Sequence, residues 1–195
     1  MKVRPLTFDT LVFEIAGRIN ALNGRVRVLI DGAPAAEPGK LADAVVEPLR
    51  ALGRAVQRVS TEDFLRPASV RLEHGRTDSY SYRHDWFDIN GLQREVLDPA
   101  LDGKVLPSLW NAATDRASRA EYVDVPENGV VIVDGTLLLD RWLPAELTVH
   151  LWLSPAALKR KTTEQWTLPA FDDYEPQADL LVRYDHPERP GLVES

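Results

Sequence analysis

The segment VVIVDGTLLL, residues 130–139, constrains the fold more than any other part of the chain. It is almost entirely apolar up to Asp134-Gly135, and a strand without alternating polar residues is typical of the interior of a parallel sheet. Four other short segments have the character of strands: 25–31, 55–60, 147–153 and 178–185. Helical patterns separate them. The sequence therefore predicts an α/β fold, a doubly wound parallel sheet of about five strands flanked by helices, with ligands beyond the carboxyl ends of the strands.

Apolar residues at three- and four-residue steps predict the helices. An extra N-terminal helix should end at Asn23-Gly24, with a stripe formed by Leu11, Val12, Ile15, Ile19 and Leu22. A second helix should end at Gly53, a third should cover 89–101, and a fourth should follow Ser154 as its N-cap. The polar and aromatic stretch 68–83 has no period, so we expect a long loop there.

Length and composition limit the number of domains and the kinds of partner. A chain of 195 residues suits one domain, which we expect to span 1–195, with the helix in 1–24 and the core in 25–195. The net charge of −7 and the scattered Lys and Arg argue against a nucleic-acid partner. No segment has the length of a membrane span, and the N-terminus does not resemble a signal peptide. We therefore expect a cytoplasmic protein without a membrane partner.

The stretch VLIDGAPAAEPGKLADAV, residues 28–45, joins a predicted strand to a predicted helix, as a phosphate-binding loop does. The spacing differs from the motif G-x-x-x-x-G-K-[ST]. Read without gaps from Gly32, the second glycine falls on Glu37, the lysine on Pro38 and the hydroxyl on Gly39. Pro38 is a natural first helical residue, which favours this register. Glu37 would then stand at the helix N-terminus, where its carboxylate would repel a phosphate.

A second register inserts two residues into the loop. Gly39-Lys40 then becomes the glycine-lysine pair, and Leu41 stands where the hydroxyl belongs. In both registers the Mg²⁺-binding hydroxyl is missing. A third interpretation is that the loop only connects a strand to a helix. The sequence alone leaves these alternatives open.

Five segments resemble, in the same order, segments of uridine kinases and nicotinamide riboside kinases. They are VSTEDFLRP, HDWFDINGLQREVLDPALDGK, LPSLWNAATDRASR, VVIVDGTLLL and ADLLVRYDHPERPGLV, and together with the loop they extend from Arg25 to about Val193. The resemblance implies a P-loop NTPase-like kinase fold. It also implies transfer of the γ-phosphoryl group of ATP to a hydroxyl of a nucleoside or similar small molecule, with ATP and Mg²⁺ as cofactors.

The resemblance assigns the phosphate-acceptor side to three segments. In the acidic turn, Glu62 or Asp63 would accept the proton of the attacking hydroxyl, unless both only cap the next helix. Asp85 would bind the sugar, beside aromatic residues that include Trp86 and could stack on a base or form a hydrophobic cluster. Trp110 and Arg116 occupy a further substrate segment. Arg116 would contact substrate or pair with the neighbouring Asp115.

On the phosphate-donor side, the resemblance assigns phosphate binding to Gly32, Gly39 and Lys40, and to Arg160 in the lid segment. Asp134 would hold Mg²⁺, or would only form a turn. The lid offers Lys159, Arg160 and Lys161 but lacks a full set of arginines.

Two functional hypotheses follow. The first is a uridine kinase-like phosphotransferase, and the second is a catalytically inactive relative that binds a nucleoside or acts in regulation. A homodimer could form through the stripe of the N-terminal helix, unless that stripe covers the sheet.

Overall fold

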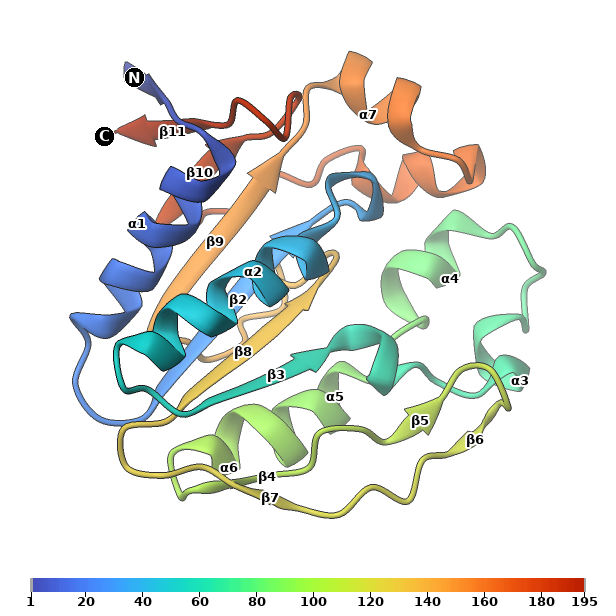
Figure 1. Ribbon diagram of the computed structural model, residues 1–195. Coiled ribbons are helices and arrows are strands. Elements are labelled where there is room, and N and C mark those ends of the chain that lie inside the picture. Colours follow the sequence, from blue (N-terminus) through green and yellow to red (C-terminus); the bar gives the residue numbers. More distant parts are fainter. Residues whose placement is uncertain (1, 195) are drawn as a thin grey trace.

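The computed structural model describes residues 2–194, and its centre is a seven-stranded sheet with the order β1-β11-β10-β9-β2-β8-β3 (Figure 1). All five predicted strands are present and parallel: β2 (Val26–Gly32), β3 (Val56–Ser60), β8 (Val130–Gly135), β9 (Leu147–Trp152) and β10 (Leu180–Arg183). Two strands were not predicted. β1 (Lys2–Pro5) and β11 (Gly191–Glu194) join the two ends of the chain in an antiparallel edge, so the sheet is mixed. Each is only four residues long, too short for a clear pattern.

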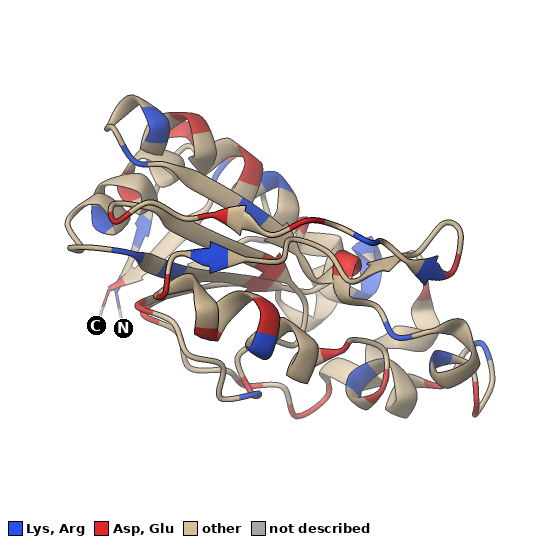
Figure 2. Ribbon diagram, turned by 90° about the horizontal axis from the view of Figure 1, so that it is seen from below, with Lys and Arg blue, Asp and Glu red and all other residues tan. Residues whose placement is uncertain are grey.

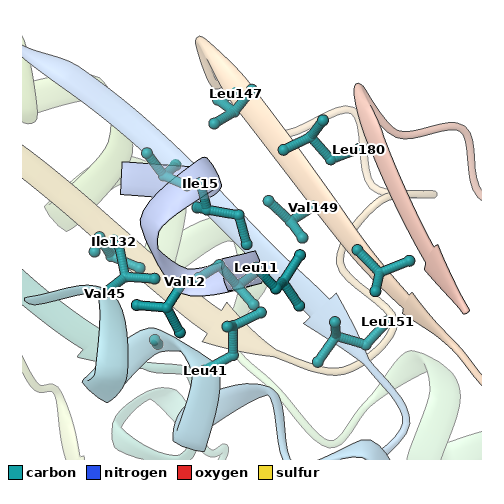
Figure 3. Close-up of a cluster of buried hydrophobic side chains, with 14 of the residues drawn as sticks. Leu11, Val12, Ile15, Leu41, Val45, Ile132, Leu147, Val149, Leu151 and Leu180 are labelled. Atoms are coloured by element: carbon teal, nitrogen blue, oxygen red, sulfur yellow. The ribbon is translucent and has the colours of Figure 1, made fainter. Parts of the chain in front are cut away.

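Helices α1 (Phe8–Asn20) and α2 (Pro38–Ala51) cover one face of the sheet. The stripe of α1 is buried, and Figure 3 shows Leu11 and Ile15 directed toward β9 and Val12 directed toward α2, within the same buried cluster. The predicted N-terminal helix is confirmed. Its stripe covers the sheet, so these side chains are not available for a homodimer interface.

The opposite face is covered by one helical segment made of α5 (Ile89–Leu92), the π-helical η3 (Gln93–Leu97) and α6 (Asp98–Ala100). Strand β8 alternates between the two faces: Ile132 packs with α1 and α2, whereas Val131 and Val133 pack on the other side. Both faces are thus covered, which explains why this strand is apolar throughout.

The stretch 68–83 is not one long loop, because it contains α3 (Ala68–Arg71) and most of α4 (Ser79–His84). Asp78 caps α4 by accepting a hydrogen bond from the Ser81 amide, a local signal that periodicity does not detect. The predicted helix after Ser154 is α7 (Pro155–Lys161). The remaining elements are η1 (Pro34–Ala36), η2 (Thr61–Phe64), η4 (Gln165–Phe171), and the two-stranded pairs β4 (Lys104–Val105) with β7 (Val123–Asp124) and β5 (Trp110–Asn111) with β6 (Arg116–Ala117).

Among residues 2–194, no helix is long and apolar enough to cross a membrane. Figure 2 shows acidic and basic residues interspersed along the ribbon in this view, without a basic face.

Candidate functional site

The carboxyl ends of the central parallel strands meet at one edge of the sheet, where a doubly wound fold binds its ligands. The strand register places Ser60 beside Asp134, and Asp31 beside His150. The faces of these side chains differ, because neighbouring residues of a strand point to opposite sides. Asp134 follows Ile132 on the face covered by α2, whereas Asp31 follows Leu29 on the face covered by α5.

The loop after β2 has the backbone of the ungapped register. Helix α2 begins at Pro38, and Glu37 has φ 53° and ψ 56°, a left-handed conformation that favours glycine. Glu37 thus adopts a glycine-like conformation at the position where the motif has its second glycine. The loop between β2 and α2 is therefore more than a simple connection. Its backbone geometry agrees with the ungapped register, in which Gly39, and not Leu41, stands where the motif has its hydroxyl residue.

Two glycines of the loop lie in tight surroundings. A Cβ atom on Gly32 would lie 3.1 Å from Leu151 Cβ on the neighbouring strand β9. A Cβ atom on Gly39 would lie 2.7 Å from Arg58 Nη2 and 3.1 Å from Asp134 Oδ2. The position where the motif has a hydroxyl is therefore next to Asp134, but an arginine fills the space that a side chain would need.

That arginine binds Asp134 through both carboxylate oxygens. Arg58 Nε donates to Oδ1 at 2.7 Å and Nη2 donates to Oδ2 at 3.0 Å, while Nη1 lies 3.1 Å from Asp43 Oδ1. Asp134 is 4% exposed. Burial raises the pKa of its carboxyl, and the Arg58 guanidinium opposes this shift. Burial also lowers the pKa of Arg58, but the bonds to Asp134 outweigh it and leave that pKa raised.

These residues do not fit Mg²⁺. Both oxygens of Asp134 are engaged by a cation, and Gly39 supplies no hydroxyl. Within residues 2–194, no group of three His, Asp or Glu side chains is arranged to hold a metal ion. Mg²⁺ in such sites is held by one or two carboxylates with substrate phosphates and water, so what opposes the predicted metal role of Asp134 is the engagement of both its oxygens by Arg58.

The predicted phosphate-binding cations lie on the surface. Lys40, in the first turn of α2, is exposed and forms no ion pair with any residue in 2–194. Glu37 is exposed as well. Arg160 is exposed in the last turn of α7, next to Lys159 and Lys161. The loop therefore has no buried cation of its own.

The acidic turn forms η2 at the carboxyl end of β3. Glu62 is exposed, but the groups packed around its carboxyl desolvate it enough to raise its pKa, with Arg71 opposing and Asp63 and Asp134 adding to the shift. Burial raises the pKa of the half-buried Asp63. Carboxyls of raised pKa suit the acceptance of a proton.

Neither acidic side chain of the turn caps the next helix. The first amide of α3, on Ala68, donates to Asp115 Oδ1 at 3.0 Å. The interpretation of Glu62 and Asp63 as helix caps is therefore wrong, and Asp115 has that role.

Backbone hydrogen bonds join the acidic turn to the segment of Asp85. The Arg66 amide donates to the Trp86 carbonyl at 3.0 Å, and the Asp88 amide donates to the Phe64 carbonyl at 2.7 Å. Asp85 ends α4 and lies 3.4 Å from Arg66 Nη1. The structure thus brings these two parts of the predicted acceptor side together.

Trp86 belongs to a hydrophobic cluster rather than to an open stacking surface. Its ring lies 5.4 Å from that of Tyr82 and 5.6 Å from that of Trp166. The Arg71 guanidinium lies over the ring at 5.2 Å. A base could stack there only by displacing Arg71.

The hairpin of β5 and β6 carries Trp110 and Arg116 beside the acidic turn, because the Leu109 amide donates to the Asp63 carbonyl at 2.9 Å. Trp110 Nε1 donates to Asp115 Oδ1 at 3.1 Å. Arg116 is exposed and forms no ion pair within residues 2–194. The alternative pairing of Arg116 with Asp115 is therefore wrong, since Arg71 lies 3.5 Å from Asp115 instead.

A second buried network includes residues that the sequence analysis did not select. Asp31 is fully buried and lies 2.6 Å from His150 Nδ1 and 2.9 Å from the Tyr174 hydroxyl. A histidine at the centre of the apolar strand LTVHLWL was the available signal, because a buried polar residue needs partners.

Comparisons with known proteins identify the fold. No protein-family model matches the sequence, and no curated protein sequence matches it. Among solved structures, one described as a possible uridine kinase from Bacillus stearothermophilus matches with a TM-score of 0.70 and 19% identity, covering 87% of this chain and 96% of that one. A candidate fructose transport system kinase from Silicibacter sp. TM1040 matches with a TM-score of 0.70 and 22% identity, covering 90% and 98%. The YGR205w protein matches with a TM-score of 0.63 and 10% identity, covering 97% and 100%.

The chain therefore has a uridine kinase-like P-loop kinase fold, as predicted.

Proposed function

We propose that this chain binds a nucleoside-like small molecule and does not transfer a phosphoryl group from Mg²⁺-ATP. The observation that carries the proposal is the two-point ion pair between Arg58 and the buried Asp134. It places an arginine beside Gly39, where a P-loop kinase needs a metal ion and a hydroxyl. The net charge of −7 and the scattered Lys and Arg favour a small molecule over nucleic acid or a membrane as the partner.

Several charge effects act against the phosphate donor. Phosphoryl transfer depends on positioned cations and amides, and one such element is typically worth about 2.7–4 kcal/mol. In this chain Pro38 stands at the lysine position and Gly39 at the hydroxyl position. Glu37 adds a negative charge at the N-terminus of α2, where a phosphate would bind. A site with all three changes should bind ATP poorly.

A phosphotransferase of the uridine kinase type is the second candidate, and the acidic turn favours it. Backbone hydrogen bonds join the segment after Glu62 and Asp63 to the segment of Asp85, and desolvation raises the pKa of both turn carboxyls. Such carboxyls could receive the proton of an acceptor hydroxyl. The two candidates therefore share the acceptor side and differ only in the donor.

Calorimetric titration separates the two candidates. The protein would be titrated with Mg²⁺-ATP, then separately with uridine, cytidine and nicotinamide riboside. We expect heat from at least one nucleoside and none from Mg²⁺-ATP. Binding of Mg²⁺-ATP that is lost in Lys40→Ala, but kept in the matched surface variant Lys104→Ala, would contradict the proposal and make Lys40 the phosphate-binding lysine.

Restoring the motif tests the same proposal from the other direction. The variant Glu37→Gly, Pro38→Lys, Gly39→Ser and Arg58→Gln returns the glycine, lysine and hydroxyl and removes the guanidinium that would collide with Ser at position 39. We expect it to gain Mg²⁺-ATP binding. A folded variant without such binding would show that other residues exclude the donor.

A further inference from the structure

A cavity of about 550 Å³ opens at the carboxyl end of β9, between α7, η4 and residues 172–175. It extends to Ala33, the first residue after Gly32. Most of its wall is apolar or aromatic and includes Trp152, Leu158, Leu168 and Phe171. The volume lies in the range of small-molecule sites.

His150 is a buried polar residue that lines this cavity, and its hydrogen bonds place a proton on Nδ1. The Leu139 amide can only donate, so the Tyr174 oxygen accepts that bond at 3.0 Å and its own proton is directed to Asp31 Oδ2 at 2.9 Å. The Leu138 amide donates to Asp31 Oδ1 at 2.9 Å. The Asp31 carboxylate thus accepts the hydrogen bonds from the Leu138 amide and the Tyr174 hydroxyl. Its Oδ2 lies 2.6 Å from His150 Nδ1, and this contact requires a proton on Nδ1.

The consequence is a defined acceptor inside the cavity. With Nδ1–H directed at Asp31, the neutral imidazole has its lone pair on Nε2, and Nε2 is the ring nitrogen left for a ligand. The Tyr174 ring lies 5.9 Å from the imidazole and holds it from the side. Burying Asp31 and His150 is costly unless both are hydrogen-bonded, and this network, completed by the half-buried Tyr174, supplies the partners.

The charges around the cavity disfavour an anionic ligand. Asp172, Asp173 and Glu175 line it and only one cation, Lys159, opposes them among its described lining residues. This excess of carboxylates disfavours a phosphate. A flat molecule with N–H donors fits both the aromatic wall and the Nε2 acceptor.

We propose that this cavity is a nucleoside-binding site in which His150 Nε2 accepts a hydrogen bond from an N–H group of the base. Asp31 and Tyr174 act as positioning residues that hold the imidazole in the required tautomer. This inference rests on the proposed function, because it takes a nucleoside as the ligand. It places the base beneath α7 and η4 and not against Trp86, whose ring is covered by Arg71.

Calorimetry with uridine, cytidine and adenosine tests the site in three variants. His150→Phe removes the acceptor, Leu168→Trp fills the cavity from its wall and leaves the network intact, and His74→Phe makes the same chemical change at an exposed histidine. We expect affinity for the best nucleoside to fall at least about tenfold in the first two variants and to stay unchanged in the third.

Nitrogen NMR of the wild-type protein with labelled histidine gives a readout that does not depend on the folding of any variant. We expect the Nδ1–H tautomer for His150 in the free protein and a shift of its Nε2 resonance on addition of the nucleoside. A structural role alone would leave Nε2 unmoved by the nucleoside.

The outcomes separate this inference from the proposed function. Nucleoside binding that is unaffected by His150→Phe and Leu168→Trp, with an unmoved Nε2 resonance, overturns the site but leaves nucleoside binding in place. Absence of nucleoside binding to the wild-type protein overturns both. Turnover of Mg²⁺-ATP with the Nε2 response intact overturns only the proposal of an inactive donor side.

Discussion

Replacing Arg58 by alanine tests whether this arginine is the group that neutralises Asp134. The substitution removes hydrogen bonds of 2.7 and 3.0 Å from the carboxylate of a residue that is 4% exposed. We expect Arg58→Ala to lower the free energy of unfolding at neutral pH, because it leaves a buried charge without its partner.

The magnitude follows from the burial of the two side chains. Removing one partner of a buried ion pair typically costs about 3–5 kcal/mol. The Arg58 side chain is 31% exposed, so water can reach Asp134 once the guanidinium is gone, and we expect the lower end, about 3 kcal/mol. In a chain of this size each kcal/mol shifts Tm by about 2–4 °C, so Tm should fall by roughly 6–12 °C.

The loss should depend on pH in a defined direction. Burial raises the pKa of Asp134 in the folded protein, so the folded state holds this proton more tightly than the unfolded state. Such a group contributes stability below its unfolded pKa of about 3.9, and this contribution is lost as pH rises through the folded pKa. Removing Arg58 raises the folded pKa further. The destabilisation of Arg58→Ala should therefore be largest near neutral pH and should shrink as pH falls.

Urea unfolding, followed by circular dichroism at about pH 7 and about pH 5, measures both effects. Arg50→Ala is the matched control, because the Arg50–Glu47 pair is exposed and should contribute at most about 1 kcal/mol. The double variant Arg58→Ala, Asp134→Asn should recover much of the loss at neutral pH. A cost in Arg58→Ala no larger than in Arg50→Ala, and equal at both pH values, would refute the role given to Arg58.

Three further substitutions test other parts of the structure by urea unfolding. Ile15→Ala should cost about 2–5 kcal/mol because Ile15 is fully buried, whereas Phe13→Ala, on the exposed side of α1, should cost much less. Tyr174→Phe should cost about 1–3 kcal/mol, because it leaves buried hydrogen-bonding partners unsatisfied. Gly39→Ala should displace the Arg58 guanidinium, since the new Cβ atom would lie 2.7 Å from Nη2, but this end of the arginine side chain is flexible, so the cost should be much smaller than that of Arg58→Ala; an equal cost would contradict this packing.

The central part of the fold could be predicted from the sequence because burial on both faces leaves a strong signal. Strand β8 is apolar in every residue before Asp134, and the stripe from Leu11 to Ile19 marks α1. Strands β1 and β11 could not be predicted, because each has only four residues and together they contribute one apolar side chain, Leu192, to the buried core. Helix α4 was missed because its main signal is the single cap at Asp78.

The site was predicted unevenly for a physical reason. Motif positions such as Asp134 and Glu62 follow from the resemblance and from strand ends, and the structure brings them together. The partners that decide their chemistry come from other strands, so the sequence does not display them. Nothing in the sequence distinguishes Arg58 from the other residues of its strand. The contact of His150 with Asp31 depends on the register of β9 against β2, which the sequence does not show.

The altered residues of the donor side form one structural change rather than several separate ones. Arg58 pairs in register with Ile132, and its side chain reaches forward along the same face to Asp134. Glycine at residue 39 leaves room for the guanidinium in this position, since a Cβ atom there would lie 2.7 Å from Nη2 and the flexible end of the arginine would have to shift. The glycine at the hydroxyl position and the arginine on Asp134 therefore act together against a metal site. A substitution at residue 39 alone should not restore a metal site, and the change that matters for donor chemistry is the combined one at Gly39 and Arg58.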